Sequence, residues 1–140
     1  VEFTKVAMQP GMPQGFGTLG REGTPIFCLP GNPVSALVSF EVFVRPAIRL
    51  ILGKTRLHRR TVTATAIQSM TSPAGRRQYR RGLLRREPDD RYTVESVGGT
   101  GSHLIAALAR ANCLIVIGDD VTEVPEGSEV TVIPLLISGG

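Results

Sequence analysis

The chain has 140 residues, 41% of them hydrophobic, which is enough for one domain or two small ones with packed cores. No run approaches the roughly 20 apolar residues that cross a bilayer and the N-terminus carries no signal pattern, so we expect a cytoplasmic protein. The net charge of +4 favours anionic partners, whereas the absence of Trp and an aromatic content of 5% argue against stacking on nucleic-acid bases.

The N-terminal residues predict strands separated by a rigid loop. β-Branched residues within residues 1–7 suit a short strand. Two prolines and two glycines exclude a helix from residues 9–15 and predict a loop there. After a polar turn at residues 21–24, residues 25–29 form a short continuous apolar run. Such a run is typical of a strand buried on both faces in an α/β layer.

The clearest helix in the sequence is predicted over residues 34–52, before Gly53 ends it. Asn32 is placed to cap the helix, and Pro33 suits the first helical position, where no amide hydrogen bond is lost. Pro46 lies inside the segment, so we expect it to kink the helix or divide it in two.

From about residue 58 the pattern changes to short β-like runs at residues 61–68, 77–86, 91–97, 112–117 and 129–134. These runs predict a small β-barrel or sandwich with one helix, over residues 102–110. The charged stretch at residues 54–60 suits an exposed linker. The predicted fold is therefore an α/β part, residues 1–54, followed by a small all-β barrel domain with one short helix, residues 55–140.

The tight turn at residues 30–33 lies between a predicted strand and a predicted helix. A helix start can bind an anion, because it offers unpaired amide donors and the positive end of the helix dipole. The alternative is that the turn only caps its helix, and the turn taken alone favours this second interpretation. Neither a Walker loop nor a dinucleotide-binding fingerprint is present.

Arginines are concentrated in one predicted strand, at Arg76, Arg77, Arg80, Arg81, Arg85 and Arg86. Guanidinium groups suit phosphate and other oxyanions. Strand alternation places Arg77 and Arg81 on one face, and Arg76, Arg80 and Arg86 on the other. No continuous basic stripe forms, and most of these side chains are predicted to lie on a solvated surface.

Other reactive side chains give weaker signals. Cys28 and Cys113 lie far apart in apolar runs, so we interpret both as reduced core residues in preference to a disulfide. His58 and His103 have no partner at metal-ligand spacing and are interpreted as structural or exposed. The acidic pair at residues 119–120 fits a polar turn better than a metal site.

At residues 29–36 (LPGNPVSA) the sequence resembles the signature of molybdopterin molybdenumtransferases, a family that includes the E domain of gephyrin. Further similarities follow in the order of the family, at residues 10–13 (PGMP), 79–82 (YRRG), 101–103 (GSH) and 111–113 (ANC). The resemblance extends over essentially the whole chain. It identifies the chain as a C-terminal part of such an enzyme.

The resemblance implies that residues 1–54 end the molybdopterin-binding α/β domain and that the remainder is the family's C-terminal β-barrel domain. In molybdenum cofactor biosynthesis, these enzymes insert molybdate into adenylylated molybdopterin with release of AMP in a magnesium-dependent step. The implied pterin-binding residues are Pro30, Gly31, Asn32, Pro33 and Ser35. The implied oxyanion-site residues are Gln9, Met12, Pro13, Arg81 and Ser102.

Two departures from the family pattern bear on activity. The family loop commonly reads KPGKP, whereas Gln9 and Met12 stand at the positions of its lysines, which removes two positive charges. The segment that would hold most of the Mg²⁺ ligands lies upstream in the family, so no metal ligand is expected in these 140 residues. We expect the chain alone to be inactive and the longer parent to be a homodimer. The alternative is a non-catalytic pterin-binding, anion-binding or scaffold module with a degenerate site.

Overall fold

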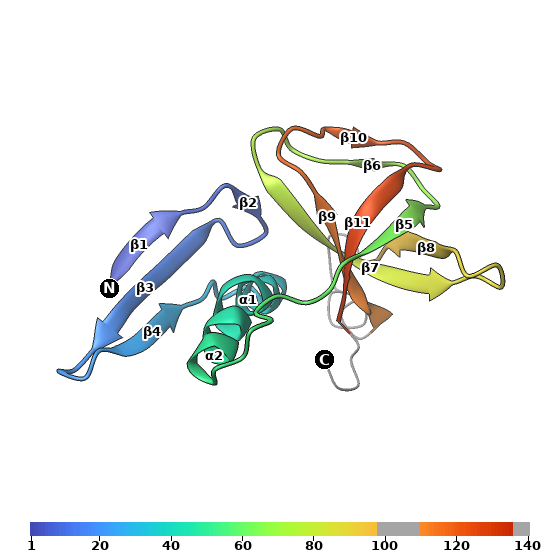
Figure 1. The fold of residues 1–140 in the computed structure, drawn as a ribbon. Helices are drawn as coiled ribbons and strands as arrows, with labels where there is room; N and C mark the ends of the chain where they lie inside the picture. Colours follow the sequence, from blue (N-terminus) through green and yellow to red (C-terminus); the bar gives the residue numbers. More distant parts are fainter. Residues whose placement is uncertain (98–109, 136–140) are drawn as a thin grey trace. The chain divides into compact units, whose positions relative to one another are not determined.

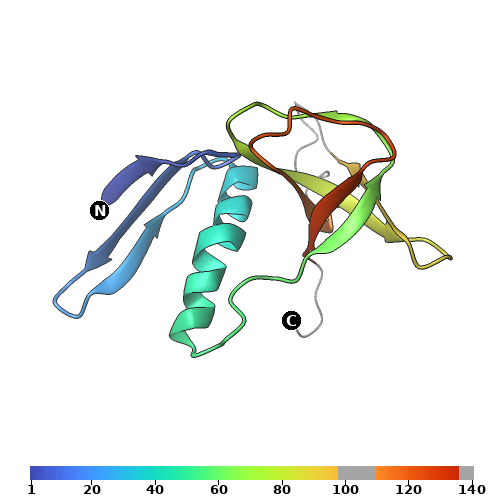
Figure 2. The ribbon, with the colours of Figure 1, turned by 45° about the horizontal axis from the view of Figure 1, so that its top comes forward.

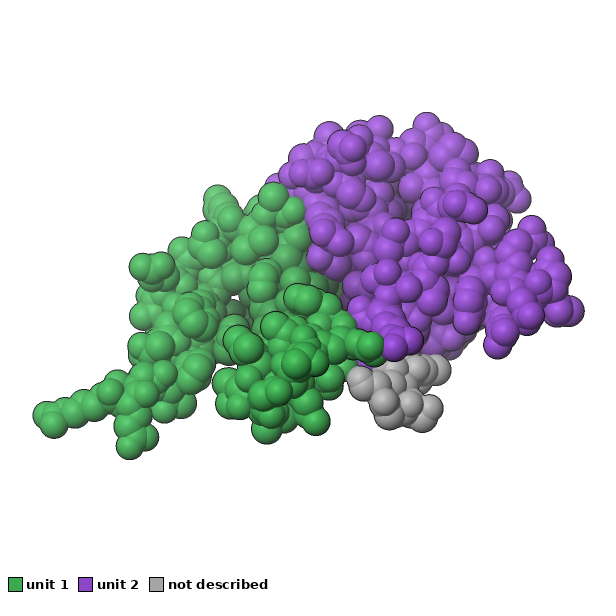
Figure 3. Space-filling model, in the orientation of Figure 1, with its two compact units in different colours: residues 1–58 green, residues 59–140 purple. Residues whose placement is uncertain are grey.

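The structure is a computed structural model and describes residues 1–97 and 110–135. The chain forms two compact units, residues 1–58 and 59–140, which Figure 3 shows in different colours. None of the helices in the described residues has the length and apolar content needed to cross a membrane. The predicted helix at residues 102–110 lies, except for Arg110, outside the described residues.

The first unit contains an antiparallel sheet in the order β1-β3-β4 and a helical segment (Figure 1). Its strands are β1 (Glu2–Lys5), β3 (Pro13–Leu19) and β4 (Thr24–Cys28), and a short strand β2 (Met8–Gln9) lies between β1 and β3 in the sequence. The register aligns Phe3, Gly15 and Cys28 across the sheet. The loop predicted at residues 9–15 is therefore shorter than expected, because β3 begins at Pro13.

The prediction that residues 25–29 form a strand buried on both faces was wrong in its burial. Strand β4 is exposed at its first two residues and half-buried at the other three. In the described sheet it pairs with β3 alone and runs antiparallel to it. A continuous apolar run suggests two covered faces, but side chains of β4 stay partly exposed because the described residues do not cover both faces of this sheet completely.

The predicted long helix is present (Figure 2), and a π-helical turn interrupts it. The segment comprises α1 (Pro33–Ser39), the π-helical turn η1 (Phe40–Val44) and α2 (Arg45–Ile51). Within it the Arg45 amide donates to the Phe40 carbonyl, five residues earlier, directly before Pro46, which has no amide to donate. The helix accommodates Pro46 by widening the turn that precedes it. Gly53, at φ 75°, then ends the helix.

The second unit is a closed β-barrel. Strands β7, β8, β5, β11 and β9 pair in that order, and β9 pairs back with β7. Their bounds are β5 (Val62–Ala66), β7 (Arg77–Arg86), β8 (Tyr92–Ser96), β9 (Cys113–Ile117) and β11 (Glu129–Pro134). Closure leaves no open edge among these strands. The prediction of an α/β part followed by a small barrel is confirmed, and each strand lies within its predicted run.

Two short strands of the second unit were not predicted. These are β6 (Met70–Thr71) and β10 (Glu123–Val124), which pair with each other antiparallel. Met70 and Val124 are both buried and join the core cluster of the barrel. A two-residue strand is too short to show the alternation by which strands are recognised in a sequence.

The barrel core is built from small and β-branched side chains. It comprises Ala64, Ala66, Met70, Val94, Cys113, Ile115, Ile117, Val124, Val130 and Val132. At Gly82 of β7 a Cβ atom would lie 2.9 Å from two side-chain atoms of Ile115. Because real Cβ contacts essentially never fall below 3.0 Å, a side chain at position 82 would force Ile115 to shift in the packed core.

Asn112 fastens β7 to the start of β9. Its amide oxygen accepts from the Leu84 N–H at 2.7 Å, and its amide nitrogen donates to the Leu84 carbonyl at 3.0 Å. The Asn112 backbone N–H also donates to the Gly82 carbonyl at 3.0 Å. One side chain therefore satisfies both backbone groups of Leu84 beside the β7–β9 pairing.

We predict that Asn112→Ala lowers the free energy of unfolding by about 2 kcal/mol, because both backbone groups of Leu84 lose their partner in a part-buried position. Urea unfolding of the chain would measure the loss. Asn112→Asp keeps the acceptor and removes the donor, so its free energy of unfolding should lie between those of the alanine variant and the unsubstituted chain. An alanine variant as stable as the unsubstituted chain would contradict this role for Asn112.

Candidate anion-binding site

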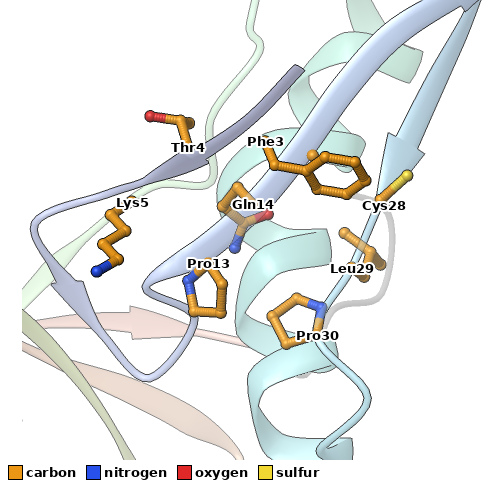
Figure 4. A pocket seen from close by; sticks show the side chains of 9 residues that line it. Phe3, Thr4, Lys5, Pro13, Gln14, Cys28, Leu29 and Pro30 are labelled. Carbon is orange, nitrogen blue, oxygen red and sulfur yellow. The ribbon is translucent and has the colours of Figure 1, made fainter. Parts of the chain in front are cut away.

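A pocket of about 390 Å³ lies in the first unit, over β1, β3 and the end of β4. Its lining residues are Phe3, Thr4, Lys5, Pro13, Gln14, Gly15, Cys28, Leu29 and Pro30. Figure 4 shows Lys5, Pro13 and Pro30 toward one end and Phe3 and Cys28 toward the other. The antiparallel sheet therefore brings the loop after β2 and the turn after β4 to one end of a single pocket.

Of the residues implied by the family resemblance, Pro13 and Pro30 line this pocket. Gln9, Met12 and Ser35 are not among the residues that line it, although Gln9 is exposed and the other two are half-exposed. Ser102 lies outside the described residues. The pocket thus contains one member of the implied pterin set and one of the implied oxyanion set.

Lys5 is a pocket residue that was not predicted from the sequence. It pairs with Pro13 in the β1–β3 register, and its exposed side chain supplies the cation among the lining residues. The sequence contains a signal for this position. Two short β-like runs that flank a tight loop pair as a hairpin, and the pairing places the last residue of the first run opposite the first residue of the second.

The helix start does not offer the free amides that the anion-binding interpretation requires. The Asn32 amide oxygen accepts from the N–H of Val34 at 2.9 Å and of Ser35 at 3.4 Å. The Ala36 N–H donates to the Asn32 carbonyl at 2.9 Å, and Pro33 has no N–H. An anion would therefore have to displace the Asn32 side chain, and the structure favours the simple capping role of this turn.

The loop between β2 and β3 packs directly against the end of α1. Gly11 is buried at φ 94°, and a Cβ there would lie 2.9 Å from the Ser39 hydroxyl oxygen. The Met12 carbonyl accepts from the Val6 N–H at 2.7 Å, which closes the loop on itself. The backbone that presents Gln9, Met12 and Pro13 is thereby held on one side by the helix.

In the second unit, Arg81 differs from the other arginines of β7. One of its terminal nitrogens, Nη1, is buried and has no hydrogen-bond partner in the described part of the chain. Arg80 instead donates to the Thr71 carbonyl at 2.9 Å and to the Ser96 hydroxyl at 3.2 Å. Burial lowers the pKa of the Arg81 guanidinium from its usual value. Arg81 keeps an unused, desolvated donor, which is a feature that suits an oxyanion.

The predicted alternation of these arginines between two faces stays a prediction; Arg76 lies outside β7, and the other five lie in it. Arg80 lies opposite Ile115, and Arg81 lies opposite Leu114 on the next position of β9. Arg85 and Arg86 form ion pairs, with Glu95 at 3.2 Å and with Asp90 at 3.0 Å. Two of the six arginines are thus paired with carboxylates at the surface.

Both cysteines are free, as predicted, but their surroundings differ. Cys113 is fully buried in the barrel core, and burial raises the pKa of its thiol to about 12, against a smaller opposing effect of a backbone hydrogen bond at Gly82. Cys28 is only half-buried and lines the pocket, so its assignment to the core was wrong. His58 is exposed, which agrees with its interpretation.

Comparisons with known proteins agree with the sequence resemblance. Residues 63–135 match the family of the MoeA C-terminal region (domain IV), and residues 1–50 match a probable molybdopterin binding domain. Molybdopterin molybdenumtransferase 1 of Mycobacterium tuberculosis is 52% identical over 136 residues, which cover 94% of this chain and 32% of that protein. Molybdopterin molybdenumtransferase 2 of the same organism is 52% identical over 132 residues, with 94% and 31% covered.

A solved molybdopterin biosynthesis MoeA protein from Pyrococcus horikoshii superposes with a TM-score of 0.78 at 27% identity. The match covers 96% of this chain and 32% of that protein. The chain therefore spans about a third of the length of the relatives that it matches.

We predict that Asn32→Ala lowers the free energy of unfolding by about 1 kcal/mol, because the Val34 and Ser35 amides lose their acceptor. Asn32→Asp keeps the acceptor oxygen and should lose little. Denaturant unfolding followed by helical circular dichroism would measure both variants. If alanine had no effect, the cap would contribute nothing to the helix and its amides would be open to other partners.

We also predict that iodoacetamide at pH 8 modifies Cys28 in the folded chain and leaves Cys113 unmodified until the chain unfolds. With a thiol pKa of about 12, only about 10⁻⁴ of Cys113 is ionised at that pH. In the folded barrel the Cys113 thiol stays protonated above pH 9, whereas in the unfolded chain it ionises near pH 9. The free energy of unfolding should therefore fall as the pH rises from 9 toward 12. Peptide mass analysis would identify the labelled cysteine, and early labelling of Cys113 would contradict its burial.

Proposed function

Because the chain belongs to the family of the MoeA C-terminal region, we propose that it works in molybdenum cofactor biosynthesis as part of a molybdopterin molybdenumtransferase. In this proposal residues 1–54 end a molybdopterin-binding domain and residues 55–140 form the C-terminal barrel domain. The observation that carries the proposal is the pocket that Lys5, Pro13 and Pro30 line together. It joins two loops that the family resemblance links separately to oxyanion and pterin.

The proposed substrates are adenylylated molybdopterin and molybdate, and the proposed products are the molybdenum cofactor and AMP. Lys5 supplies a positive charge to an anion in the pocket, and Arg81 supplies an unused guanidinium N–H to an oxyanion. Pro30, Gly31, Asn32, Pro33 and Ser35 are proposed for the pterin, with Gln9, Met12, Pro13 and Ser102 proposed for the oxyanion. For Asn32 this requires its side chain to leave the helix amides or to bind through its exposed nitrogen.

The proposal also includes Mg²⁺, a homodimeric parent and a cytoplasmic location. Within residues 1–97 and 110–135, no group of three or more His, Cys, Asp or Glu side chains is arranged to hold a metal ion. These residues therefore do not fit a magnesium site, and we derive no step through the metal from them. Cations on this part of the chain act on the anions of the substrates instead.

A chimera tests the activity. The corresponding third of the Mycobacterium tuberculosis molybdopterin molybdenumtransferase 1 is replaced by this chain, to which it is 52% identical. With adenylylated molybdopterin, magnesium and molybdate, we expect AMP release that depends on molybdate, despite Gln9 and Met12. The control is the Mycobacterium tuberculosis relative with its own sequence in this third. A chimera that binds the pterin and releases no AMP at any molybdate concentration would instead indicate a non-catalytic pterin-binding module.

We predict that Arg81→Met in this chimera lowers kcat/KM by about 100-fold, since an unused buried donor is removed from the oxyanion. The matched control is Arg86→Met, which removes an exposed arginine of the same strand that pairs with Asp90. It should leave kcat/KM within about twofold, because surface ion pairs contribute little. Equal losses in the two variants would show that Arg81 acts through general charge and has no specific role.

A further inference from the structure

The Gln14 side chain connects the pocket to the helix behind it. Its amide nitrogen donates to the Gly11 carbonyl at 2.7 Å and to the Ser39 hydroxyl at 2.7 Å. Ser39 is fully buried in α1, and Gln14 itself lines the pocket beside Pro13. One amide group thus ties the loop of residues 9–13 to α1 at the place where Gly11 already contacts Ser39.

We propose that Gln14 is a positioning residue that fixes the loop of residues 9–13 against α1, and thereby sets the end of the pocket that receives the oxyanion. This inference rests on the proposed function. Both protons of the Gln14 amide are used, one toward the loop and one toward the helix. A hydrophobic side chain of similar length can make neither contact.

The geometry explains why the sheet alone does not fix this loop. Strand pairing holds Lys5 opposite Pro13, but it ends there, and residues 10–12 lie outside the strands of the hairpin. Further contacts at this loop include the Val6–Met12 backbone bond, the packing of Gly11 on Ser39 and the two bonds of Gln14. Gln14 is the polar side chain among them that joins the loop to the helix.

The test compares Gln14→Met and Ser39→Ala with a matched control, Gln68→Met, in the 140-residue chain. Gln68 is a half-buried glutamine of the barrel unit that donates to the Ser96 carbonyl at 3.5 Å. Two quantities are measured: the hydrogen-exchange protection of the Val6 amide, and the affinity for molybdate by isothermal titration calorimetry. We expect Gln14→Met to reduce both, with about fivefold weaker molybdate binding from the loss of a buried hydrogen bond.

Ser39→Ala removes only the bond to the helix, so it should weaken molybdate binding by no more than Gln14→Met does, and adding it to Gln14→Met should change little, because that bond is already absent. Gln68→Met should change neither quantity. Gln14→Glu adds a pH-dependent readout: a carboxyl group donates only when protonated, so Val6 protection should recover on acidification in this variant and not in Gln14→Met.

The outcomes separate the inference from the proposed function. Reduced Val6 protection with unchanged molybdate affinity would overturn Gln14 as a positioning residue while the molybdate site stands. Unchanged protection and unchanged affinity would overturn it as well. If the unsubstituted chain binds no molybdate at millimolar concentration, the proposed oxyanion site fails in this chain, and the inference that rests on it fails too.

Discussion

The close approach of β7 to β9 is the constraint on which the barrel depends. Closure requires β7 to pair with β8 and with β9, and at Gly82 the second pairing leaves no room for a Cβ atom. The next residue back in the sequence is Arg81, whose buried Nη1 has no partner in the described residues. The same contact that closes the barrel therefore sets the position of the arginine to which we assign chemistry. Asn112 reinforces the contact from the β9 side.

Glycines of the family-like motifs have two kinds of surroundings in this structure. Gly82 and Gly11 are both places where the chain packs too closely for a side chain, against Ile115 and Ser39 respectively. Gly31 has no atom within 4 Å of where its Cβ would lie. Protein packing explains the first two glycines but not the third. The space beside Gly31 is open, as it is beside the turn glycines Gly20 and Gly23, so packing alone assigns Gly31 no role.

The sequence predicted the barrel strands well because alternation and turn residues are local signals. The runs at residues 77–86 and 129–134 coincide with β7 and β11. Features that depend on pairing or on a side-chain conformation were not predictable in this way. Lys5 reaches the pocket through the β1–β3 register, and the Asn32 side chain blocks the helix amides through the rotamer it adopts. The π-helical turn before Pro46 depends on how the whole helix accommodates a missing donor.

The occupied helix start changes where anion recognition has to come from. The Val34 and Ser35 amides donate to the Asn32 side chain, so fewer neutral donors are free for an anion. Gln9 and Met12 stand at two positions where the family pattern has lysine, so fewer positive charges lie on the loop. Charged side chains at fixed positions then matter more, since a charge-assisted hydrogen bond is about twice as strong as a neutral one. Lys5 is fixed by strand pairing and Arg81 by the barrel wall. Both cations therefore stand on β-strands, and neither lies in a loop.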